Sequence, residues 1–159
     1  SLISKLRTGV GVDAHQFGDS GPCALAGLSW ADAPRLVGHS DGDAAAHALC
    51  DAVLSACQLG DVGTFFGVDL PEMAGASGVA MIEKVREFVT SKGFVINNVG
   101  LTIVGNQPKI TPRRDEAQKV LSDALGAPVS VAATTSDQMG FTGRGEGIYV
   151  IANALVVAP

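Results

Sequence analysis

The distribution of apolar residues predicts two amphipathic helices in the second half of the chain. Residues 77–92 carry apolar side chains at helical spacing, and Gly93 closes the pattern. A second helix is indicated by Thr111 as its cap, Pro112 in its first turn and Gly126 beyond its end. We expect both helices to pack on a core through their apolar stripes, which are Met81, Ile82, Val85, Phe88 and Val89 in the first and Ala117, Val120, Leu121, Ala124 and Leu125 in the second.

The remaining apolar segments predict five strands and one more helix. Alternating or β-branched residues indicate strands at 7–15, 23–30, 94–104, 129–133 and 147–158. The alanine- and leucine-rich segment 43–59 predicts a helix with Ser40 or Asp41 as its cap. In this order the elements predict an α/β (α+β) fold, a mixed sheet with helices packed on one face. Since no linker or repeat divides the chain, we expect a single domain over 1–159.

Composition narrows the classes of function. The 159 residues carry a formal net charge of -5 with scattered basic residues, which argues against nucleic acid or an anionic membrane as partner. The apolar run 147–158 is too short to span a membrane, which takes about 20 residues. Three cysteines, Cys23, Cys50 and Cys57, lack metal-binding spacing and indicate small buried thiols. Because the start shows no secretory pattern either, we expect a cytoplasmic protein.

The clearest chemical signal lies in two short stretches that hold all three histidines, Asp13-Ala14-His15 and the segment from His39 to His47. Side chains two apart in a strand point to the same face of the sheet, so Asp13 and His15 can bind the same ligand. His47 is expected about one turn inside a helix. One carboxylate and two imidazoles suit zinc in a tetrahedral site with an open fourth position. A turn at Asp13 and hydrogen-bonded structural histidines are the alternative, and His39 is left as a candidate substrate contact.

Two glycine-rich loops and one lysine are further candidates for ligand binding. In the loop 60–71, Asp61 lies between glycines and can hold the hydroxyls of a sugar, although a mobile surface loop has the same pattern. In the loop 134–147, three consecutive hydroxyl side chains, one arginine and four glycines suit a phosphate, while a glycine-rich turn between strands is the alternative. Lys109 follows a predicted strand, at a place where open sheets often bind ligands.

Taken together, these motifs resemble those of a known family, the 2-C-methyl-D-erythritol 2,4-cyclodiphosphate synthases of the non-mevalonate isoprenoid pathway. They follow the order of that family through nearly the whole chain. The resemblance is carried by Asp13-Ala14-His15, His39-Ser40-Asp41-Gly42-Asp43 with His47, Gly60-Asp61-Val62-Gly63, Pro108-Lys109, Thr134-Thr135 and the run 140–147.

The resemblance implies a homotrimer with each active site between neighbouring subunits and with zinc bound by Asp13, His15 and His47. It also implies that a CDP-linked substrate, 4-diphosphocytidyl-2-C-methyl-D-erythritol 2-phosphate, is closed into a cyclic diphosphate with release of CMP. Magnesium or manganese on the diphosphate would assist. Because the substrate's own phosphate attacks the β-phosphorus, positioning and charge neutralisation dominate. A zinc hydrolase would instead need a general base, for which His39 is the only uncommitted histidine.

The resemblance also implies roles for single residues. His39 and Thr135 are expected to assist the transition state. Asp61 and Gly63 match the ribose contacts with Phe66 on the same loop, and the segment 105–111 with Gly105, Lys109 and Thr111 matches the cytosine pocket. The other expected substrate contacts are Asp13, His15, Ser40, Thr134, Asp137, Phe141 and Arg144. Arg144 and Glu146 also match the rim of a central trimer cavity, which binds isoprenoid diphosphates in some members.

The chain departs from the family pattern at two places. Gly67 and Val68 stand where many members have proline and aspartate, which affects the predicted contact to the methylerythritol hydroxyls. Asp137 occupies a position that is often glutamate, and its shorter reach calls for a bridging water. The competing hypothesis is a trimeric, metal-stabilised protein that binds isoprenoid diphosphate without turnover.

Overall fold

A computed structural model describes residues 1–38, 42–66 and 77–159. Its main sheet has the strand order β1-β6-β4-β5. Strand β6 is antiparallel to both of its neighbours, whereas β4 and β5 are parallel, so the predicted mixed sheet is confirmed. The strands are β1 (Leu6–Gln16), β4 (Val95–Val104), β5 (Val129–Thr134) and β6 (Gly147–Val157).

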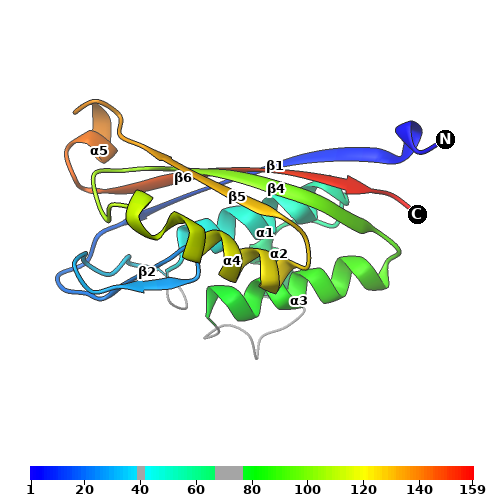
Figure 1. The fold of residues 1–159 in the computed structure, drawn as a ribbon, viewed down its shortest axis with the longest axis horizontal. Coiled ribbons are helices and arrows are strands. Elements are labelled where there is room, and N and C mark those ends of the chain that lie inside the picture. The colour runs from blue at the N-terminus through cyan, green and yellow to red at the C-terminus, as the bar shows by residue number, and fades with distance from the viewer. Residues whose placement is uncertain (39–41, 67–76) are drawn as a thin grey trace.

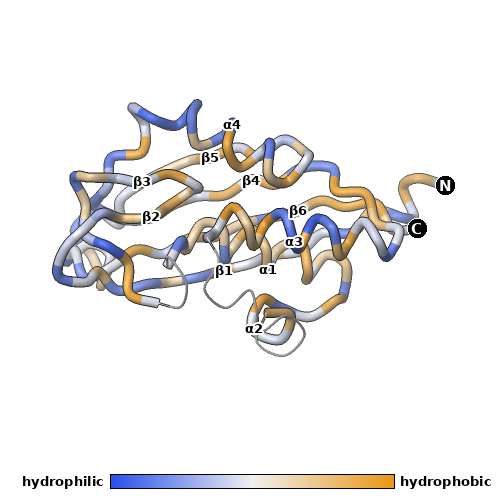
Figure 2. Tube along the Cα trace, turned by 90° about the horizontal axis from the view of Figure 1, so that it is seen from below, coloured by the Kyte–Doolittle hydropathy of each residue, from blue (hydrophilic) through white to orange (hydrophobic). Residues whose placement is uncertain are grey.

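Helices cover one face of this sheet (Figure 1). They are α1 (Ala44–Ala56), α3 (Gly78–Ser91) and α4 (Arg114–Leu125). From the helix side, α1 lies against β1 and β6, and α4 lies against β5 (Figure 2). The core between the two layers contains the inward side chains of the central strands and the apolar stripes of the helices, as predicted. Among the described residues, no helix is both long and apolar enough to cross a membrane.

Two glycines in β1 let α1 approach the sheet closely. A Cβ on Gly9 would lie 2.3 Å from the Ala52 carbonyl oxygen, and one on Gly11 would lie 2.1 Å from the Ala48 oxygen. Real Cβ atoms essentially never come within 3.0 Å of such neighbours. The helix backbone therefore occupies the space that side chains at these two positions would fill, which places the start of α1 directly over the end of β1.

The segment predicted as one strand at 23–30 is instead a small hairpin, so that prediction is wrong. Strands β2 (Cys23–Leu25) and β3 (Leu28–Trp30) pair antiparallel around a turn at Ala26 and Gly27, both of which have positive φ. The reason lies in Asp43, whose buried carboxylate accepts the N–H groups of Ala26 (2.9 Å) and Gly27 (2.8 Å). This tertiary contact holds the turn against α1, and a pattern along the chain does not reveal it.

Helix α1 is capped by Asp43, whose side chain accepts the N–H of Ala46 at 3.1 Å. The helix is thus shorter than the predicted 43–59, and the predicted caps Ser40 and Asp41 lie outside the described residues. At α4 the predicted cap Thr111 is wrong. Thr111 is already inside a 3₁₀ turn, η4 (Thr111–Arg113), and so lacks the extended backbone that a capping residue needs. The predicted end is confirmed, since Gly126 adopts φ +73 after the last turn.

The outer edge of the sheet at β5 is covered by side chains of α4. Ser122 accepts the N–H of Val129, and Gln118 accepts the N–H of Val131, both at 2.9 Å. Two backbone donors of the edge strand are therefore already bound within the chain.

The other face of the sheet carries no helix in the described part of the chain. Val10 is 60% exposed, Val12 48% and Ile151 41%, which leaves an apolar surface across β1 and β6. The three cysteines are buried free thiols, as expected. Burial raises the pKa of Cys23 to about 12 and of Cys57 to about 11, so neither thiol is poised to react.

Candidate metal centre and active site

The structure brings Asp13, His15 and His47 together. Asp13 and His15 lie near the end of β1 and face α1, where His47 is in the first turn. His15 Nε2 is 2.8 Å from Asp13 Oδ2, and His47 Nδ1 is 3.3 Å from the same oxygen. One ligand atom from each residue can be chosen so that all three lie within 4.8 Å of one another. The predicted grouping on one face of a strand and at the start of a helix is confirmed.

Hydrogen bonds fix the orientation of these groups. His15 Nδ1 donates to the Val37 carbonyl at 2.7 Å, so Nδ1 carries a proton and Nε2 is the atom presented to Asp13. Burial alone would raise the pKa of Asp13, but the hydrogen bonds with His15 and His47 outweigh it and lower this pKa to about 2. The bond to Asp13 in turn raises the pKa of His15, against the effect of burial.

The donor set fits a zinc ion. Two imidazole nitrogens and one carboxylate oxygen are common zinc ligands, and three protein ligands leave one coordination position for a substrate oxygen. His47 contacts Asp13 through Nδ1, whereas its buried Nε2 has no hydrogen-bond partner among the described residues. The Val37 carbonyl already supplies His15 with the outer contact that zinc-binding histidines usually have.

The start of the predicted ribose loop lies against α1, the helix that carries His47. Asp61 caps a short helix, α2 (Val62–Thr64), by accepting the Thr64 N–H at 2.8 Å, and this bond lowers the pKa of Asp61. Asp61 and Gly63 are exposed, whereas Phe66 is only 6% exposed and packs in the core. The first two are accessible to a ligand in this chain. The contact predicted for Phe66 stays a prediction.

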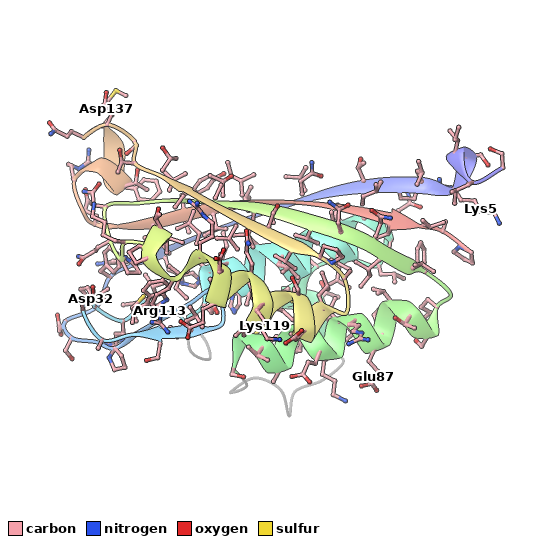
Figure 3. All side chains as sticks on the ribbon, in the orientation of Figure 1. Lys5, Asp32, Glu87, Arg113, Lys119 and Asp137 are labelled. Carbon is pink, nitrogen blue, oxygen red and sulfur yellow. The ribbon has the colours of Figure 1, made fainter. Side chains whose placement is uncertain are left out.

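A second set of predicted residues lies at the other edge of the sheet. Gly105 donates its N–H to the Thr134 carbonyl at 3.0 Å, which joins the 105–111 segment to the end of β5. The exposed members of this set are Lys109, Thr111, Thr134, Thr135 and Asp137. Asp137 projects at the end of the molecule near α5 (Gly140–Gly143), as Figure 3 shows.

Within one chain, the strand order and register of the sheet separate the Asp13-His15-His47 cluster from the residues around Thr134. His15 pairs with Ile148 of β6, and Thr134 lies beyond β4, so the two residues are three strands apart. With about 4.8 Å between strands, the separation is roughly 14 Å. Thr134 also alternates with the buried Val129 and Val131, so it lies on the open face, whereas His15 faces α1. In one chain, the Asp13-His15-His47 cluster and Thr134 therefore lie three strands apart and on opposite faces of the sheet.

A pocket of about 290 Å³ opens at the end of the sheet where His15 lies. Phe141 and Glu146 form part of its wall, and Arg144 donates from Nε to the Glu146 carboxylate. The full lining is Ala14, His15, Gln16, Phe141, Glu146 and Gly147. Of the other predicted positions, His39, Ser40, Gly67 and Val68 lie outside the described residues.

Sequence reasoning gave no role to two carboxylates near the site. Asp43 caps α1 and binds the β2–β3 turn. Asp51, one turn after His47, accepts the Val62 N–H at 2.8 Å, and burial raises its pKa. The signal for Asp43 was its place three residues before Ala46, which suits a cap. For Asp51 it was the four-residue spacing from His47, which places both residues on one side of a helix.

A mixed sheet covered by helices on one face, with an open Asp-His-His cluster at its end, defines an α/β protein with a candidate catalytic metal site. The model of the YgbB family matches residues 6–157 of the chain. The chain belongs to this family, whose curated relatives include 2-C-methyl-D-erythritol 2,4-cyclodiphosphate synthases. The family expected from the motifs is confirmed.

Two curated relatives illustrate the match. The chain is 53% identical over 153 residues to the 2-C-methyl-D-erythritol 2,4-cyclodiphosphate synthase of Cutibacterium acnes, covering 96% of this chain and 91% of that protein. It is 51% identical to the bifunctional enzyme IspD/IspF of Clavibacter michiganensis, covering 98% of this chain and 38% of that protein. The chain therefore spans nearly all of the first relative but well under half of the bifunctional one.

Two solved structures have the same fold. A 2C-methyl-D-erythritol-2,4-cyclodiphosphate synthase in a CDP-bound form matches with a TM-score of 0.85 and 29% identity, covering 94% of this chain and 99% of that one. The CDP complex of IspF from Plasmodium falciparum matches with a TM-score of 0.83 and 26% identity, covering 96% of each chain.

Proposed function

We propose that this chain converts 4-diphosphocytidyl-2-C-methyl-D-erythritol 2-phosphate to 2-C-methyl-D-erythritol 2,4-cyclodiphosphate and CMP, in the non-mevalonate isoprenoid pathway. The names of its relatives and the CDP complexes of two similar structures support this reaction. Within the chain, the observation that carries the proposal is the convergence of Asp13, His15 and His47 on one point.

The reaction needs positioning rather than a protein nucleophile. An oxygen of the substrate's 2-phosphate attacks the β-phosphorus, and the bond from that phosphorus to the oxygen bridging to the α-phosphate breaks. That oxygen leaves with CMP and carries its electron pair. Zinc held by Asp13, His15 and His47, with magnesium or manganese on the diphosphate, would act as a Lewis acid toward phosphate oxygens and neutralise the charge that develops.

Residues other than the proposed metal ligands would bind the nucleoside and assist the transition state. The exposed Asp61 carboxylate and the Gly63 backbone would hold the ribose hydroxyls, while Lys109 and its segment from Gly105 to Thr111 would hold the cytosine. His39 and Thr135 would assist the transition state as hydrogen-bond donors. The remaining proposed substrate contacts are Ser40, Phe66, Thr134, Asp137, Phe141 and Arg144.

We further propose a homotrimer in which one subunit supplies the metal cluster and its neighbour supplies Thr135. The separation of three strands between His15 and Thr134 supports this arrangement, because the two groups of one chain lie well apart. The exposed apolar side chains of Val10, Val12 and Ile151 support the open sheet face as the contact surface. Sedimentation of Val12→Glu should then show dissociation to smaller species.

A second candidate function is isoprenoid diphosphate binding without turnover. The pocket beside Phe141 and Glu146, whose carboxylate accepts a hydrogen bond from Arg144, favours this candidate. We expect the enzyme to work in the cytoplasm, because its three cysteines are free thiols.

A phosphorus NMR time course with the CDP-linked substrate, zinc and magnesium tests the reaction. Appearance of CMP with a cyclic diphosphate, lost after zinc is stripped and restored by zinc, would support the proposed function. Intact substrate beside metal-loaded, trimeric protein would refute it and favour the ligand-binding alternative.

A further inference from the structure

The carboxylate of Asp51 joins the helix of the metal cluster to the loop of the predicted ribose contacts. Asp51 lies on α1, one helical turn after His47, and is partly buried. Its Oδ1 accepts the backbone N–H of Val62 at 2.8 Å. A hydrogen bond to a charged acceptor is among the stronger ones in a protein. One rigid helix thus carries both a metal ligand and the anchor of a neighbouring loop.

The anchored residue lies between the two predicted ribose contacts. Val62 is flanked by Asp61 and Gly63, so fixing its N–H fixes the backbone from which both contacts arise. Asp61 in turn accepts the Thr64 N–H at 2.8 Å, which closes the first turn of α2. The Asp61 carboxylate is therefore fixed by its bond within the first turn of α2, and this turn is fixed by the bond from Val62 to Asp51.

The far end of the same segment is fixed by packing. Phe65 is 5% exposed, and its ring centroid lies 4.7 Å from that of Phe88 on α3. With Phe65 in the core and Val62 bound to Asp51, the residues between them have little freedom. The exposed oxygens of Asp61 are presented at a defined position relative to His47.

We propose that Asp51 is a positioning residue that aligns the Asp61–Gly63 segment with the metal cluster, so that the ribose hydroxyls of a cytidine nucleotide are read at a fixed distance from its phosphates. This inference rests on the proposed function and deepens it. Asp51 touches neither ribose nor phosphate. It acts through the backbone of Val62.

The test compares two nucleotides on zinc-loaded protein by calorimetry. CDP carries both ribose hydroxyls, whereas 2′,3′-dideoxy-CDP lacks them and keeps the base and phosphates. We expect the wild type to bind CDP about tenfold more tightly or better, the effect of one or two good hydrogen bonds. In Asp51→Ala this preference should fall nearly to one, with zinc content and dideoxy-CDP affinity unchanged.

Two variants separate positioning from general stability. Asp51→Asn keeps an oxygen that can accept the Val62 N–H, so it should restore most of the preference for CDP. Ser122→Ala removes a comparable side-chain acceptor, 2.9 Å from the Val129 N–H at the other end of the sheet, and should leave the preference intact. A merely structural role of Asp51 would weaken both nucleotides equally.

Four results would overturn the inference. Asp51→Ala with the wild-type preference for CDP would show that the loop needs no anchor. Failure of Asp51→Asn to restore the preference would mean that charge rather than the hydrogen bond matters. A wild type that binds both nucleotides equally would refute the reading of ribose while leaving the reaction intact, whereas a wild type that binds neither would refute the proposed function as well.

Discussion

The close approach of α1 to β1 makes Gly11 a sensitive position. In Gly11→Ala the new Cβ would lie 2.1 Å from the Ala48 oxygen and 2.5 Å from the Ala52 nitrogen, both backbone atoms. To restore even 3.0 Å, α1 must retreat by about 0.9 Å. Metal ligands tolerate distance errors of only about 0.2 Å. Because His47 is on α1 and Asp13 on β1, the retreat should separate the ligands, and overpacking should lower the free energy of unfolding by about 3 kcal/mol.

Two assays test this expectation without relying on turnover. Urea unfolding of the metal-free protein measures the loss of stability. Titration with Co²⁺, whose visible absorption reports tetrahedral coordination, measures how well the ligand set still closes on a metal. We expect at least a tenfold loss of Co²⁺ affinity in Gly11→Ala.

Gly9→Ala is the matched control. Its Cβ would lie 2.3 Å from both the Ala52 oxygen and the Ala56 nitrogen, so the overlap is similar. It acts at the end of α1 remote from His47, and it should cost similar stability but less metal affinity. Wild-type stability and Co²⁺ affinity in Gly11→Ala, or equal loss of affinity in both variants, would refute the reasoning.

Three further predictions concern single positions. Against the effect of burial, the hydrogen bonds with His15 and His47 lower the pKa of Asp13 from 3.8 to about 2, so its contribution to stability is present above about pH 4 and is lost as the pH falls toward 2. Acid unfolding of metal-free Asp13→Asn should therefore be less steep, and an unchanged slope would contradict this. His47→Ala should lose zinc and nearly all turnover, and full activity in a zinc-free variant would end the metal assignment. Asp43→Ala should lower the free energy of unfolding by about 3 kcal/mol, because it leaves buried N–H groups without an acceptor, and a loss below about 1 kcal/mol in urea would contradict that.

The grouping of Asp13, His15 and His47 was predictable because it rests on short-range periodicity. Asp13 and His15 share a strand face through their two-residue spacing, and His47 follows the start of an alanine-rich helix. Only the pairing of that strand with that helix needed the fold. The amphipathic helix at α3 and the glycine that ends α4 were predictable for the same reason.

The features that sequence reasoning missed depend on contacts between distant residues. The β2–β3 turn is held by Asp43, which lies 16 and 17 residues away from the two N–H groups that it binds. The link from Asp51 to Val62 is of the same kind. Thr111 does not cap α4 because it begins a 3₁₀ turn that precedes this helix. A local sequence pattern does not determine the backbone angles just before a helix.

The covered edge at β5 bears on how copies of this chain can meet. An edge strand with free backbone donors invites another strand to add to it, which leads to open-ended aggregates. Here Gln118 and Ser122 already accept the N–H groups of Val131 and Val129, so an incoming strand would first have to displace them. Growth of the sheet by strand addition is thereby discouraged at this edge, so the proposed association through the open apolar face would not compete with strand pairing there.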